Sequence, residues 1–192
     1  MRTAVRSAAL IAFSVACGYA KLILFPYLFF VELFSVAVFL SGALLGPAWG
    51  AWVGGVARLV FSVGNPYGPP HPLVLVAQVL GGAVIGALGG IVGRWLAPRT
   101  GAADSLPNRA PAGARTRAAL LVISGIVGTL AYDTLTNVAQ GVVFGSVPAT
   151  LALGAIPALQ HVGSNAVLFL VLGSAAFPWL SRHPAAVGRG PA

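Results

Sequence analysis

The chain has 192 residues, of which 58% are hydrophobic and 7% are charged, and its formal net charge is +8. A soluble domain has roughly 25% charged residues, so this composition excludes an ordinary soluble protein. It predicts an all-α membrane protein in which residues 1–192 form a single membrane domain. The positive charge does not indicate a nucleic-acid-binding face, because the arginines gather at the ends of apolar segments.

Apolar runs separated by Gly, Pro or Arg divide the chain into six predicted helices. Each run approaches the roughly 20 residues that cross a 30 Å hydrocarbon layer. We expect the first run to remain in the mature protein, because Lys21 and more apolar sequence after Pro26 follow it. The sequence therefore predicts a bundle of six transmembrane helices, over residues 7–24, 27–45, 48–64, 72–96, 117–145 and 153–178.

The arginines orient the predicted bundle. Six spans place nine of them at segment ends on one side, which the positive-inside rule makes cytoplasmic. Residues 98–116, rich in Pro, Ala and Arg, are predicted to be a flexible cytoplasmic linker. We therefore expect a multi-pass protein of a cell membrane with both termini in the cytoplasm. The nine are Arg2, Arg6, Arg94, Arg99, Arg109, Arg115, Arg117, Arg182 and Arg189.

Small residues recur every fourth position in several runs. A stripe of this kind lets another helix approach closely. For the glycine series we predict close packing within the bundle. The alanine stripe of the first run continues to the cytoplasmic end, where it predicts a docking surface for a partner subunit, with packing inside the bundle as the open alternative. The alanines are Ala4, Ala8, Ala12, Ala16 and Ala20, and the glycines are Gly42, Gly46, Gly50, Gly54, Gly82, Gly86 and Gly90.

Two of the three acidic residues, Glu32 and Asp133, fall inside apolar runs. A charge placed in hydrocarbon marks a functional site by default. At about 1.5 Å of rise per residue, Asp133 lies roughly 24 Å across its span, and Glu32 and His161 lie about 8 Å from the outer face. Lys21 and Arg58 fall in the same outer layer. The sequence therefore predicts that these side chains converge in the outer half of the membrane.

Helical spacing predicts a cavity in that layer. Asp133, Asn137 and Gln140 share one helical face, and His161 and Asn165 share a face of the next run. Two polar stripes on neighbouring helices favour a ligand pocket between them, although hydrogen bonds and ion pairs that only hold the bundle remain the alternative. The predicted substrate-binding residues are Lys21, Glu32, Arg58, Asn65, Tyr67, His71, Asp133, Asn137, Gln140, His161 and Asn165.

The chain resembles the substrate-binding S-components of energy-coupling factor (ECF) transporters, the vitamin uptake systems of prokaryotes. The likeness lies in the six apolar runs and the alanine stripe, and in four short motifs. It implies the substrate-capture subunit of an importer, with the ligand in the outer half. It also implies that Ala8, Ala12 and Ala16 meet a transmembrane coupling subunit, which two cytosolic ATPases drive. The motifs are Leu44-Leu45-Gly46-Pro47-Ala48-Trp49-Gly50, Gly64-Asn65-Pro66, Tyr132-Asp133-Thr134-Leu135-Thr136-Asn137, and the segment from His161 to Asn165.

The resemblance implies that the subunit topples in the membrane to deliver its substrate. The chain has no Gly-x-x-x-x-Gly-Lys-Ser/Thr loop, so ATP hydrolysis must come from partners. With three histidines and one cysteine, a dedicated metal cage is poorly supported, and we expect neither a cofactor nor catalytic activity. Two alternatives stay open. One is a noncatalytic membrane scaffold, and the other is an intramembrane enzyme with Asp133 and His161 as acid and base and Ser164 as nucleophile.

Overall fold

The computed structural model describes residues 2–24, 31–96 and 113–177, and these residues form helices joined by short connections. The predicted all-α class is confirmed for this part of the chain. The last helix passes into one turn of π-helix, η1, and the two form a single helical rod over Val147–Phe177. The helices are α1 (Arg2–Leu24), α2 (Leu33–Leu45), α3 (Pro47–Val63), α4 (Pro72–Leu96), α5 (Ala114–Phe144) and α6 (Val147–Leu168), followed by η1 (Phe169–Gly173).

Four helical segments of the described chain are long and apolar enough to cross a membrane, namely α1, α4, α5 and the rod Val147–Phe177. They indicate a multi-pass membrane protein, because four such helices in one chain are typical of that class. The other two helices are shorter, with 13 residues in α2 and 17 in α3. At about 1.5 Å per residue, α2 is only about 20 Å long.

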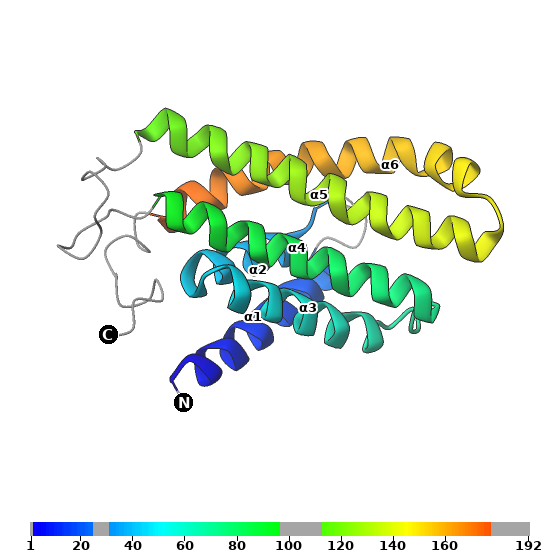
Figure 1. Ribbon diagram of the computed structural model, residues 1–192, viewed down its shortest axis with the longest axis horizontal. Helices are drawn as coiled ribbons and strands as arrows, with labels where there is room; N and C mark the ends of the chain where they lie inside the picture. The colour runs from blue at the N-terminus through cyan, green and yellow to red at the C-terminus, as the bar shows by residue number, and fades with distance from the viewer. Residues whose placement is uncertain (1, 25–30, 97–112, 178–192) are drawn as a thin grey trace.

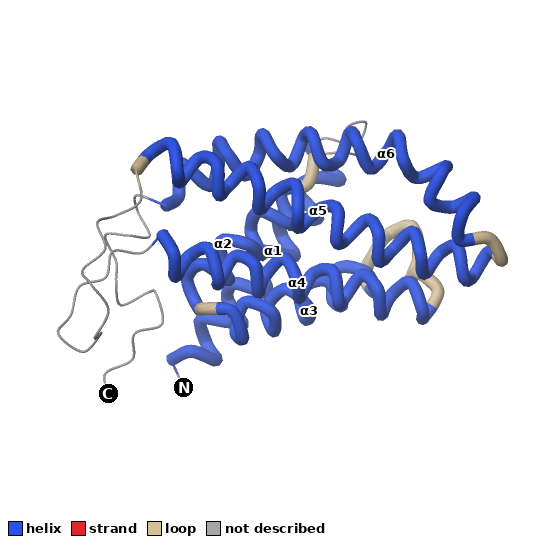
Figure 2. The backbone as a smooth tube through the Cα atoms, turned by 45° about the horizontal axis from the view of Figure 1, so that its top comes forward, coloured by secondary structure: helices blue, strands red, loops and turns tan. Residues whose placement is uncertain are grey.

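The helices lie side by side in an elongated bundle (Figure 1). The start of α1, the end of α4 and the start of α5 lie at one end of the bundle, and these termini carry Arg2, Arg94 and Arg115. We call it the arginine end. The α3–α4 and α5–α6 connections lie together at the opposite end, as Figure 2 also shows. The arginine pattern that predicts the cytoplasmic side thus matches one physical end of the bundle.

Glycines let α2, α3 and α4 approach each other at backbone distance. A methyl group on Gly86 would overlap the backbone of Gly50, and one on Gly54 would overlap the backbone of Gly82. Gly42 likewise has no room for a side chain beside Gly86. The predicted packing of the glycine series within the bundle is confirmed.

The short α2 begins inside the bundle. Its C-cap, Gly46, lies beside the guanidinium of Arg94 at the arginine end. Because α2 is only about 20 Å long, its N-terminal end stops well short of the opposite end of the bundle. Glu32, the residue before its first turn, is 8% exposed. The fold thus places a carboxylate in the interior.

Several helix boundaries differ from the prediction. The first helix begins at Arg2 rather than residue 7, and the second begins at Leu33 rather than 27, since Val31 and Glu32 are not helical. Helix α6 begins at Val147 rather than residue 153, because the Ser146 hydroxyl accepts from the backbone N–H of Ala149 at 3.3 Å and Pro148 suits a first turn.

The predicted linker over residues 98–116 is shorter at its C-terminal end, because helix α5 already begins at Ala114. Residues 98–112 of that prediction lie outside the described residues, as do Arg182 and Arg189.

Candidate functional site

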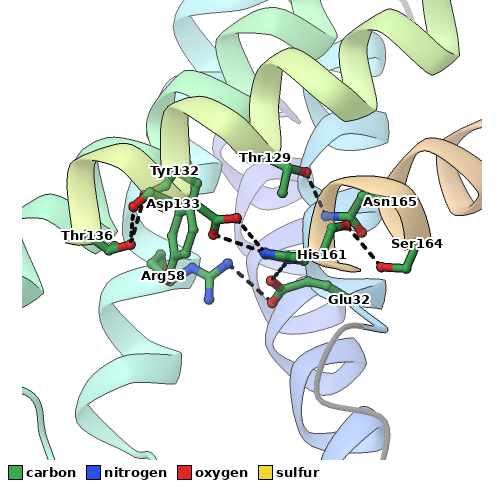
Figure 3. A network of polar contacts seen from close by, with 9 residues as sticks. All are labelled: Glu32, Arg58, Thr129, Tyr132, Asp133, Thr136, His161, Ser164 and Asn165. Atoms are coloured by element: carbon green, nitrogen blue, oxygen red, sulfur yellow. Dashed lines mark hydrogen bonds and ion pairs between the residues drawn. The ribbon is translucent and has the colours of Figure 1, made fainter. Parts of the chain in front are cut away.

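Four charged side chains from four parts of the fold meet in one network (Figure 3). His161 of α6 lies between two carboxylates: its Nδ1 is 3.0 Å from Oδ1 of Asp133 in α5, and its Nε2 is 3.1 Å from Oε2 of Glu32. Nη2 of Arg58, in α3, lies 3.4 Å from Oε1 of Glu32. The predicted convergence of these side chains is observed, while their role in binding stays a prediction.

The geometry assigns charges to the network. When Glu32 and Asp133 are both ionised they only accept hydrogen bonds, so both ring nitrogens of His161 then donate and the ring is the imidazolium. Two positive and two negative groups then balance. The four side chains are between 5% and 16% exposed, and charges this buried require partners. The mutual pairing of the four groups meets that requirement.

Aromatic rings fix the position of Arg58. Its guanidinium carbon lies 4.1 Å from the ring centroid of Phe34 and 4.5 Å from that of Tyr132. Both distances are within the range of cation–π attraction. Phe34 follows Glu32 on the first turn of α2, and Tyr132 precedes Asp133 on α5. The rings therefore belong to the same local sequences as the two carboxylates.

A cavity of about 770 Å³ lies between α5 and α6, next to the connection that joins them. We call it the α5–α6 cavity. Asp133, Asn137 and Gln140 form its α5 wall, as their spacing predicts, and His161 lines it from α6. The structure adds a set of polar groups that the sequence analysis did not select: Thr136, Ser146, Thr150 and Gln160.

A second, smaller cavity of about 280 Å³ lies on the other side of the network, against Arg58. We call it the Arg58 cavity. Glu32 and Arg58 line it, whereas Asp133 and His161 line the α5–α6 cavity. The predicted binding residues are therefore divided between two spaces. The polar groups of the Arg58 cavity are Lys21, Glu32, Arg58, Ser62, Asn65, Gln78 and Tyr132.

Three predicted binding residues line neither cavity. Tyr67 is 84% exposed, and His71 is an exposed side chain whose Nδ1 accepts from the backbone N–H of Leu73 at the start of α4. Asn165 is fully buried and donates from Nδ2 to Oγ1 of Thr129 at 2.8 Å. That bond joins α6 to α5, which is the structural alternative that the sequence analysis left open for this residue.

Gln78 is a wall residue that the sequence analysis missed. It was detectable, because it is the one polar side chain in the apolar segment from residue 73 to 92. Polar residues inside such segments rarely face lipid. Its Oε1 is buried without a hydrogen-bond partner among the described residues.

The alanine stripe of α1 faces outward. Ala4, Ala8, Ala12 and Ala16 are all exposed. The side of α1 that faces the bundle instead carries Ser7, Ser14 and Gly18, which are buried. Ala20, the last alanine of the stripe, is half-buried, so the outward face consists of the first four.

Comparison of the chain with protein-family models, curated proteins and solved structures gives no match in any of the three. Any function assigned to the chain therefore rests on its own residues and geometry.

Proposed function

We propose that the chain is the substrate-capture subunit of an ECF-type importer, a six-span protein that binds a small organic micronutrient, such as a vitamin or its precursor, and delivers it inward. The observation that carries the proposal is the α5–α6 cavity. Its volume of about 770 Å³ falls in the range of small-molecule sites, roughly 300–1,000 Å³. Its lining residues flank the α5–α6 connection, and Figure 1 shows that this connection lies at the end of the bundle opposite the arginine end, where a ligand from outside would enter.

The lining of this cavity supports a substrate class. Amides and hydroxyls dominate its polar wall, and the charged groups are Asp133 and His161, which pair with each other. Its described lining contains neither Lys nor Arg. A neutral polar molecule matches this wall better than an ion, because the one anionic and the one cationic group of the described lining are already paired with each other.

The outward stripe of α1 supports the proposed partners. In this proposal Ala8, Ala12 and Ala16 meet a transmembrane coupling subunit, and two cytosolic ATPases supply the energy. Small exposed residues at this spacing let a partner helix approach closely.

A noncatalytic scaffold is the alternative that a specific observation favours. The four charges of the network pair with one another, as they would in a site that only holds helices together. The enzyme alternative has weaker support, because the Ser164 hydroxyl donates to the backbone oxygen of His161 on its own helix, at 3.0 Å. A binding subunit retains a ligand in the α5–α6 cavity, and a scaffold does not.

The decisive experiment compares two glycines of α6. A side chain at Gly154 would enter the cavity wall and reach Asn137, whereas one at Gly163 would meet nothing within 4 Å. Mass spectrometry identifies the small molecules that co-purify with the detergent-solubilised parent, Gly154→Leu and Gly163→Leu proteins. We expect one stoichiometric compound in the parent and in Gly163→Leu, and its loss in Gly154→Leu. A parent that folds in a vitamin-replete culture yet carries no compound would favour the scaffold.

A second comparison tests the partner surface. The double variant Ala8→Leu, Ala12→Leu changes the outward stripe of α1, and Ala155→Leu adds the same side chain at an exposed site on α6. We expect the stripe variant to retain its bound compound and to lose cellular uptake of it, with uptake normal in Ala155→Leu. Normal uptake by the stripe variant would contradict docking through α1.

A further inference from the structure

The α5 wall of the α5–α6 cavity changes from polar to apolar along its length. Four of its lining residues stand at i, i+4, i+7 and i+11 on α5, namely Asp133, Asn137, Gln140 and Phe144. This spacing keeps them on one face of the helix. From Asp133 towards the α5–α6 connection, the wall therefore passes from a carboxylate through two amides to a phenyl ring.

The two amides of this wall have no partner in the protein. Neither Asn137 nor Gln140 forms a side-chain hydrogen bond or ion pair with another described residue. Both side chains are half-buried and line the cavity, and their amide atoms are accessible rather than sealed in the core. An amide has a donor and an acceptor and carries no charge. The polar section of the wall therefore offers a ligand unused hydrogen bonds of both kinds.

The section of the cavity nearest the α5–α6 connection has apolar borders. Phe144 on α5 is 77% exposed and Leu153 on α6 is 81% exposed, and both line the cavity. Ile156, three residues after Leu153, is also exposed but lies outside the lining. Exposed apolar surface around a cavity is typical of ligand-binding grooves. Phe144 and Leu153 therefore give the cavity an apolar section that a ligand can cover.

We propose that the substrate of the α5–α6 cavity is a neutral amphipathic molecule. Its polar group pairs with the amides of Asn137 and Gln140, and its apolar part lies against Phe144 and Leu153. Asn137 and Phe144 are seven residues apart, or about 10 Å along α5, which sets the distance between the polar and the apolar part. This inference rests on the proposed substrate-capture function and names the substrate class of that same site.

Four small probes vary the charge and the apolar tail separately. Hexanamide has a neutral polar group and a tail, acetamide has the same group without the tail, and hexanoate and hexylammonium have the tail and a charge. Thermal unfolding of the full chain in lipid nanodiscs measures binding, because a ligand of the folded state raises Tm in a saturable way. We expect hexanamide to bind at least about tenfold more tightly than acetamide, since each buried CH₂ group contributes about fourfold. Hexanoate and hexylammonium should give no saturable rise in Tm.

Variants of the two sections separate their contributions. We expect Phe144→Ala to weaken hexanamide binding at least about threefold and to leave acetamide binding unchanged. Ile156→Ala shortens an exposed apolar side chain outside the cavity and should bind both probes as the parent does. Gln140→Met keeps the length of the side chain but removes its amide, so it should weaken both probes about fivefold. If Gln140→Met does not fold, Asn137→Ala tests the same section.

Four results would overturn the proposal. They are no saturable hexanamide response in the parent, the same response in Gly154→Leu, an equal response to either charged probe, and an effect of Phe144→Ala no larger than that of Ile156→Ala. An unchanged response to hexanamide in Gln140→Met and Asn137→Ala would contradict the polar section in the same way.

The substrate class and the capture function can fail separately. A stoichiometric co-purified compound that is an ion would support capture and contradict this substrate class. Saturable hexanamide binding by a protein from which no compound co-purifies would support the amphipathic cavity and count against capture.

Discussion

Nε2 of His161 lies 3.1 Å from Oε2 of Glu32, although the two residues are 129 positions apart in the chain. The contact joins α6 to the residue before α2, and through Asp133 the same imidazolium reaches α5. One side chain thus links three separate segments in the middle of the bundle.

Removing this cation should destabilise the protein strongly. His161→Leu leaves two buried carboxylates without their shared partner, so we expect a loss on the order of 3 kcal/mol. Thermal unfolding in detergent measures it. Glu32 keeps Arg58 as a partner, so adding Asp133→Asn to the His161→Leu protein removes the charge that has lost its partner and should recover part of the loss. Equal stability of His161→Leu and the parent would show that the bridge does not hold the bundle.

Gly54 and Gly55 are neighbours in α3 and should respond oppositely to alanine. A methyl group at Gly54 would collide with the backbone of Gly82, whereas one at Gly55 would make ordinary contacts from 3.6 Å outward. We expect Gly54→Ala to cost about 1–3 kcal/mol through overpacking. Gly55→Ala should be neutral or stabilising by up to about 1 kcal/mol, because it removes backbone freedom from the unfolded chain. The unfolding midpoints of the two variants measure the difference. Similar losses of stability in both would argue against the α3–α4 contact.

The buried hydrogen bond from Asn165 to Thr129 should have a measurable coupling energy. In a double-mutant cycle, Thr129→Val and Asn165→Leu are compared singly and together. We expect a coupling of about 0.6–1 kcal/mol, the usual size of a hydrogen bond between membrane helices. If the two single losses are simply additive, the side chains do not interact.

Ser14 and Ser7 form a matched pair on the buried face of α1. The Ser7 hydroxyl donates to the backbone oxygen of Thr3 at 2.9 Å, whereas the Ser14 hydroxyl is buried without a partner among the described residues. Ser14→Ala removes an unsatisfied group, so we expect a gain of about 1 kcal/mol in stability. Ser7→Ala should give no gain. A loss at Ser14 would mean that its hydroxyl has a partner outside the described residues.

The sequence alone predicts the helical runs and which residues share a face of each one. Apolar composition and spacing are local properties, so the membrane class, the bounds of α4 and the polar face of Asp133, Asn137 and Gln140 follow from them directly. The sequence also identifies Glu32, Asp133 and His161 as candidate site residues, because an ionised group in an apolar run is costly wherever the helix packs.

Tertiary structure decides which faces meet, because that depends on contacts between segments far apart in the chain. Local pattern cannot show that the Glu32–His161 bridge divides the predicted pocket residues between two cavities. Neither does it show that Gln78 comes to face Arg58, a consequence of the glycine register of α3 and α4. The same reasoning applies to α1, whose sequence has small residues on two faces. Only packing shows that Ser7, Ser14 and Gly18 face the bundle and that Ala4, Ala8, Ala12 and Ala16 face outward.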